Sequence, residues 1–154
     1  MSENSTFGPK LIKAMISVGK YFQRSYFSLS DAEREIVVNL INAKWLTAYS
    51  NHEHEKIGEN AGLPPEKVQA LIAGVHTSFD EPRQQIVYDI TRMLIAPRVA
   101  PRDLYERASL YERAIEFLGD RGLADLTVLI GYLTSVSLSL AAYDAPSNAV
   151  GLKR

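Results

Sequence analysis

The sequence predicts an all-α fold in a single domain. Apolar residues recur at spacings of three and four along nearly the whole chain, and no segment alternates with a period of two. A length of 154 residues suits one domain, and an apolar fraction of 46% is ordinary for a globular protein. We expect six to seven helices within residues 10–146, between a flexible arm at 1–9 and a flexible tail at 147–154.

The first two expected helices carry clear local signals. The segment Lys10–Phe22 places its apolar residues at helical spacing. Further along, Ser30 followed by Glu33 is the pattern of a capping box, in which each residue binds the backbone of the other. The second helix should therefore begin after Ser30 and reach about Leu46.

Proline and glycine residues mark the boundaries of the later helices. Gly62 is expected as a left-handed cap that ends the third helix, and proline in the first helical turn favours new helices after it. On these signals the later helices are expected over about 50–61, 65–72, 80–95, 101–117 and 123–143.

The last of these helices contains the longest uncharged run, the eighteen residues Leu126–Tyr143. That length is at the lower limit for a membrane span, and five of the residues are Ser or Thr, so we interpret it as a buried core helix. Small residues recur in it every four positions and would let another helix approach closely; we favour core packing for Thr127, Gly131, Ser135 and Ser139.

Composition excludes several classes of function. The chain has no cysteine, which rules out disulfides, thiolate nucleophiles and cysteine-ligated metals. The net charge of −1 gives no basic footprint for nucleic acid. The opening MSENSTFGPK lacks the basic start and apolar core of a signal peptide. We therefore expect a cytoplasmic protein that binds neither nucleic acid nor a membrane.

Two of the three histidines lie together, at His52 and His54. On a helix their rings point about 200° apart, so they cannot chelate one ion, and the spacing is not that of a zinc protease. We predict no metal site. Histidine is the commonest general acid or base, and the residue one turn before His54 on the same face is Ser50.

The second helix offers a counterpart in a polar stripe formed by Glu35, Asn39 and Asn42. Two interpretations stay open: a solvated face, or a face turned toward the histidine across a pocket. In the second case Glu35 would orient His54 and stabilise its charged form. Large aromatic residues available for a pocket wall are Trp45, Tyr49 and Tyr132.

The stretch LSDAEREIVVNLINAKWLTAYSNHEHEKIGENAGLPPEKVQALIAG resembles the carboxymuconolactone decarboxylase-like family, which shares its fold with the alkylhydroperoxidase D-like proteins. The family pattern places a histidine nineteen residues after an early glutamate, as His54 follows Glu35, with Ala-Gly-Leu beyond it, as at 61–63. The resemblance covers roughly residues 8–146.

The resemblance implies an all-α homo-oligomer (a dimer, trimer or hexamer) that uses no cofactor, with its site in a cleft near the histidine helix. Thr47 and Ser50 occupy the two positions at which the peroxidase branch carries cysteine. Thiol-dependent peroxide reduction is therefore not expected.

Two hypotheses follow for function. In the first, the protein is a cofactor-free lyase or decarboxylase-type enzyme for a small organic acid or lactone: His54 transfers the proton, Glu35 orients it, and other residues bind the substrate, namely Ser50, Asn39, Asn42, Tyr49, Trp45 and Tyr132. The lysines nearest in sequence for a substrate carboxylate are Lys44 and Lys56. In the second, a catalytically degenerate family member acts as a ligand-binding or structural oligomer.

Overall fold

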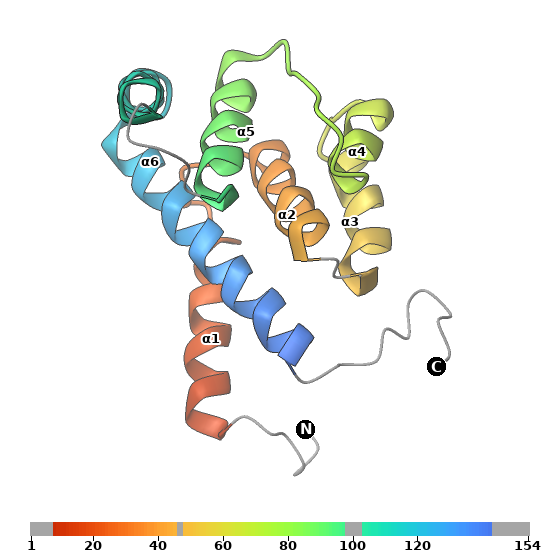
Figure 1. Ribbon diagram of the computed structural model, residues 1–154. Helices are drawn as coiled ribbons and strands as arrows, with labels where there is room; N and C mark the ends of the chain where they lie inside the picture. Colours follow the sequence, from red (N-terminus) through yellow and green to blue (C-terminus); the bar gives the residue numbers. More distant parts are fainter. Residues whose placement is uncertain (1–7, 46–47, 98–102, 143–154) are drawn as a thin grey trace.

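The computed structural model describes residues 8–45, 48–97 and 103–142. Within these residues every regular element is a helix, which confirms the predicted all-α class (Figure 1). The predicted arm and tail lie almost wholly outside the described residues. The elements are α1 (Pro9–Tyr21), α2 (Asp31–Trp45), α3 (Ala48–Asn60), α4 (Pro65–Ile72), α5 (Pro82–Ile95) and α6 (Asp103–Ala142).

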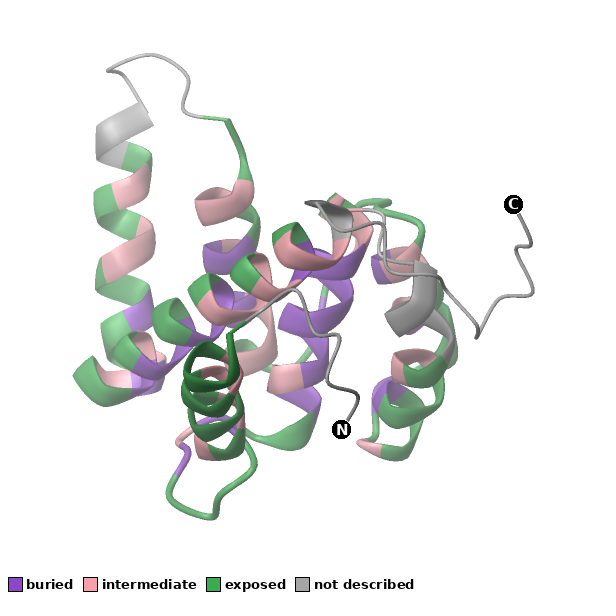
Figure 2. Ribbon diagram, turned by 90° about the horizontal axis from the view of Figure 1, so that it is seen from below, coloured by how far each residue is buried: buried purple, intermediate pink, exposed green. Residues whose placement is uncertain are grey.

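Helix α2 forms the centre of the domain. It packs against α3, α4, α5 and α6, and α5 also packs along α6 (Figure 1). Ten of the eleven residues of α2 from Ala32 to Asn42 are buried. Figure 2 shows the buried colour concentrated along this helix. Because neighbours surround α2 on several sides, its polar residues are buried as well as its apolar ones.

The local signals place helix boundaries within about two residues. The Ser30 backbone amide donates to Glu33 Oε2 at 2.8 Å, and the Glu33 amide donates to Ser30 Oγ at 3.2 Å, so the capping box is confirmed. Gly62 has a φ of 95°, which only glycine adopts without strain, and it follows α3 as predicted.

Helix α6 is two helical segments joined at Gly119, whose φ of 71° and ψ of 171° are not helical. The break expected between residues 117 and 123 is therefore confined to one residue. A helix end leaves carbonyls without an intrahelical partner, and Arg83 Nη1 on α5 donates to the Phe117 carbonyl at 2.6 Å. The same guanidinium donates to buried Glu33 at 2.9 Å and so joins α2, α5 and α6.

The second segment of α6 buries one face only, which differs from the predicted core helix. Leu126, Leu129 and Ile130 are buried, whereas Val128 and Leu138 are exposed. The small-residue stripe is also on the outer face, and a methyl group added at Gly131 would meet nothing within 4 Å. Core packing of that stripe is therefore wrong, because the larger apolar residues on the other face make the contact with the domain.

One stretch of the described chain, Glu106–Leu140, is long and apolar enough to cross a membrane by length and composition, a test that core helices of soluble proteins also pass. Of its most apolar eighteen residues, 28% are buried against the domain.

Helix α1 has no buried residue and is attached mainly at its C-terminal end (Figures 1 and 2). The Tyr21 hydroxyl donates to Asp125 Oδ1 at 2.7 Å, and the Ser28 amide and hydroxyl donate to Asp125 Oδ2 at 3.0 and 2.6 Å. Burial alone would raise the pKa of the Asp125 carboxyl, but these hydrogen bonds outweigh it and hold the pKa below its usual value. We call this set of contacts the Asp125 clasp.

Candidate active site

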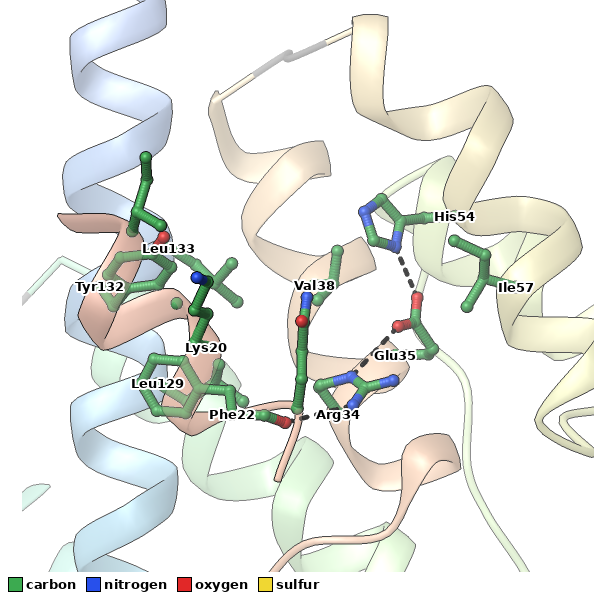
Figure 3. A pocket seen from close by; sticks show the side chains of 13 residues that line it. Lys20, Phe22, Arg34, Glu35, Val38, His54, Ile57, Leu129, Tyr132 and Leu133 are labelled. Carbon is green, nitrogen blue, oxygen red and sulfur yellow. Dashed lines mark hydrogen bonds and ion pairs between the residues drawn. The ribbon is translucent and has the colours of Figure 1, made fainter. Parts of the chain in front are cut away.

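A cavity of about 500 Å³ lies where α1, α2, α3 and α6 meet (Figure 3). This volume is in the range of small-molecule sites. Most of its wall is apolar, and the charged or titratable groups in it are few. The lining residues are Ile16, Gly19, Lys20, Phe22, Gln23, Arg34, Glu35, Val38, His54, Ile57, Leu129, Tyr132 and Leu133.

Glu35 and His54 form a hydrogen-bonded pair in this cavity. The distance from Glu35 Oε2 to His54 Nδ1 is 2.7 Å, within the range of a charge-assisted hydrogen bond. The Glu35 side chain is 2% exposed and that of His54 is 27% exposed. A molecule in the cavity therefore meets the imidazole, and the carboxylate lies behind it.

The pairing fixes the proton arrangement of the imidazole. An ionised carboxylate only accepts hydrogen bonds, so Nδ1 must carry the proton that it donates to Glu35. In neutral His54 the lone pair is then on Nε2, on the opposite side of the ring, where the described residues offer it no hydrogen bond. Nε2 is thus the atom that can take up or deliver a proton within the cavity.

The two helices that carry the pair are positioned by local packing. Glu35 lies in the buried part of α2, and His54 lies on α3, which packs against it. Gly58, one turn after His54, is buried: a methyl group there would lie 3.3 Å from the Val68 side chain of α4. The absence of a side chain at this position lets α3 lie close to α4.

Arg34 supplies a positive group to the buried carboxylate, in addition to the hydrogen bond from His54. Its Nε lies 3.6 Å from Glu35 Oε1, its Nη2 lies 3.2 Å from Asp31, and its Nη1 donates to the Phe22 carbonyl at 3.2 Å. A buried carboxylate is costly unless charges and hydrogen bonds compensate it. Arg34 and His54 together provide that compensation for Glu35.

Of the predicted aromatic wall, the structure brings Tyr132 to the cavity. Its hydroxyl has no hydrogen-bond partner among the described residues and lies close to α1 at Gly19. A methyl group at Gly19 would come within 2.5 Å of that hydroxyl. The glycine therefore makes room for the tyrosine between α1 and α6.

Three other predicted residues do not line the cavity. Asn39 is fully buried, and its Nδ2 donates to the Glu35 carbonyl at 2.9 Å, which leaves the amide facing the helix backbone. Asn42 is 5% exposed and Trp45 is partly buried, and both lie elsewhere on α2. The solvated-face interpretation of the polar stripe is wrong, because helices pack around α2. The side chains of Tyr49 and Ser50 lie outside the described residues.

The cations of the cavity differ from those that sequence proximity suggested. Lys44 and Lys56 do not line it, whereas Lys20 and Arg34 do. Arg34 directly precedes Glu35, so its place next to the buried carboxylate had a signal in the sequence. Lys20 had none, because it reaches the cavity only through the packing of α1 across the domain.

The chain matches no protein-family profile and no curated protein sequence. A relation to the carboxymuconolactone decarboxylase-like proteins can therefore be proposed only from the residues of this chain.

Proposed function

We propose that this protein is a cofactor-free enzyme of the lyase or decarboxylase type, acting on a small organic acid or lactone by proton transfer at His54. The observation that carries the proposal is the 2.7 Å pair of His54 with buried Glu35, at the wall of a cavity large enough for such a substrate.

The pair has the features that proton transfer requires. Glu35 keeps the imidazole in one orientation and one tautomer, and its negative charge stabilises the imidazolium that forms when Nε2 takes up a proton. The Glu35 side chain is 2% exposed, so water screens its charge little, which strengthens this electrostatic stabilisation. Transfer of a proton between imidazole and carbon needs neither a metal nor an organic cofactor, so the proposal includes none.

For a decarboxylation, the electron pair of the breaking carbon–carboxylate bond moves toward a neighbouring carbonyl, and carbon dioxide leaves. His54 Nε2 first takes up a proton from solvent, and the resulting enolate takes this proton at carbon, which returns the imidazole to its neutral form. The Tyr132 hydroxyl, which lines the opposite side of the cavity and has no partner among the described residues, is suited to donate a hydrogen bond to a polar group at the far end of the substrate.

We further propose that the chain is a cysteine-free relative of the carboxymuconolactone decarboxylase-like proteins, cytoplasmic and homo-oligomeric. The helical order and the pairing of Glu35 with His54 support the relationship. Thr47 and Ser50 stand at the cysteine positions of the peroxidase branch, which argues against thiol-dependent peroxide reduction.

Proton exchange next to a carbonyl tests the proposal on any compound of this chemical class that fits the cavity. A panel of β-keto acids and unsaturated γ-lactone carboxylates is incubated with the protein in D₂O. Exchange of the α-proton is followed by ¹H NMR, and release of carbon dioxide is measured in parallel. His54→Gln should lower the rate by about 10²–10⁴-fold, the usual contribution of a general acid or base.

His76→Gln is the matched control, because His76 is exposed and does not line the cavity. It should leave the rate unchanged. Wild-type rates in His54→Gln would refute the assignment. Binding of panel compounds without exchange or decarboxylation would favour the ligand-binding alternative instead.

A further inference from the structure

The charge balance of the cavity distinguishes one lysine from the other charged groups. Among the lining residues that the structure describes, Lys20 and Arg34 are cationic and Glu35 is the one carboxylate. Glu35 is engaged by His54 and Arg34, and Arg34 is also paired with Asp31. With neutral imidazole, these described lining residues therefore carry one positive charge in excess, and that charge belongs to Lys20.

Lys20 has no acidic partner among the described residues, although its side chain lines the cavity. It lies in the last turn of α1, where a cation also interacts favourably with the helix dipole. Figure 3 shows Lys20 beside Tyr132 on one side of the cavity and the pair of His54 and Glu35 on the other, with Val38 between them. A bound molecule that contacts both sides must therefore pass Val38.

Aliphatic side chains from all four helices line the cavity, with Val38 between its two sides, namely Ile16, Val38, Ile57, Leu129 and Leu133. Burial of apolar surface favours a ligand body that covers them. A second anionic group against these aliphatic side chains would lose its hydration and would find no cation to pair with. The arrangement is complementary to a molecule with one negative end and an apolar body.

We propose that Lys20 is a specificity-determining residue that binds the single anionic group of an amphipathic ligand. The apolar body of the ligand lies against the aliphatic wall, and its far end, an uncharged lactone or ketone whose α-proton is exchanged, lies beside His54. The position of the reacting end rests on the proposed function, whereas the preference for an amphipathic monoanion does not.

The test uses two fluorescent probes that differ by one charge. 1-Anilinonaphthalene-8-sulfonate carries one sulfonate, and N-phenyl-1-naphthylamine has the same aromatic body without it. Each is titrated into wild type, Lys20→Gln and Lys10→Gln. Lys10 is an exposed residue of the same helix that does not line the cavity, about 15 Å from Lys20 along the helix axis. That separation exceeds the Debye length of about 8 Å at physiological salt.

Lys20→Gln should weaken binding of the sulfonated probe about tenfold, as expected for loss of a charge-assisted contact, and leave the neutral probe within twofold. Lys10→Gln should change neither. Octanoate should displace the sulfonated probe at least tenfold more effectively than suberate, the dicarboxylate of the same length.

Several results would overturn the proposal: no saturable binding of the sulfonated probe to wild type, equal losses in Lys20→Gln and Lys10→Gln, parallel loss of the neutral probe, or equal displacement by the two acids. Probe binding involves no turnover. A failure here therefore leaves the His54 exchange experiment unaffected, and a failure of that experiment leaves the probe result standing.

Discussion

Replacing Asp125 with asparagine should weaken the attachment of α1 and lower the stability of the whole domain. The Asp125 carboxylate accepts one hydrogen bond from Tyr21 and two from Ser28, at 2.6 to 3.0 Å, and the residue is 7% exposed. Asparagine preserves the shape but removes the charge, and it has one carbonyl oxygen in place of two carboxylate oxygens.

The magnitude follows from these three contacts. Hydrogen bonds to charged groups contribute about 1.5–3 kcal/mol each, against about 0.5–1.5 kcal/mol for neutral ones. Because the asparagine amide retains part of the network, we expect a loss of about 2 kcal/mol in the free energy of unfolding. For a chain of this length that corresponds to a decrease of roughly 4–8 °C in Tm.

The effect should depend on pH in a defined direction. The pKa of Asp125 is lowered in the folded protein, so its stabilisation is complete above the unfolded-state value of about 3.9 and is lost as the pH falls through and below it. The difference between wild type and Asp125→Asn should therefore be largest at neutral pH and shrink below about pH 4.

Urea denaturation followed by circular dichroism, between pH 3 and pH 7, measures both quantities. Asp120→Asn is the control, because Asp120 is an exposed acid of the same helix with no interaction in the described structure. It should change stability by less than about 0.5 kcal/mol. Identical unfolding of wild type and Asp125→Asn at pH 7, or a difference that stays constant down to pH 3, would refute the reasoning.

Four further substitutions test the packing of the domain, each by the free energy of unfolding in urea. Gly131→Ala should stabilise the protein by about 0.5–1 kcal/mol through helix propensity. Gly19→Ala should give no such gain, because the new methyl group at position 19 collides with Tyr132. Equal gains in the two variants would contradict that contact. Gly119→Ala should cost about 1–3 kcal/mol, since its φ and ψ are nearly exclusive to glycine, and an unchanged stability would argue against the kink. Arg83→Gln should cost about 3 kcal/mol, because it leaves Glu33 buried without its cation; a loss below 1 kcal/mol would contradict this role.

The elements that the sequence predicted well are those with local signals. The capping box at Ser30, proline in a first turn and Gly62 after α3 act within a few residues, so their effect can be deduced from the order of residues alone. The pairing of Glu35 with His54 was one of two interpretations that the polar stripe left open, and their separation matched the pattern of the family that the sequence resembles.

The features that the sequence did not predict depend on how many neighbours surround a helix. Asn39 belongs to a polar stripe, yet it is fully buried because four helices pack around α2. Conversely, the small residues of α6 suggested close packing but lie on its outer face. Lys20 enters the cavity only through the position of α1, which no periodicity in its own segment could indicate.

The most direct test of the central claim is the tautomer of His54, read from long-range ¹H–¹⁵N NMR spectra of the imidazole at a pH where it is neutral. We predict that the proton is on Nδ1 in wild type, with Nε2 free to exchange protons in the cavity. Glu35→Gln should abolish this fixed preference, while exposed His76 stays the same in both proteins. A proton on Nε2, or a mixture of tautomers that Glu35→Gln leaves unchanged, would contradict the claim that Glu35 prepares His54 for proton transfer.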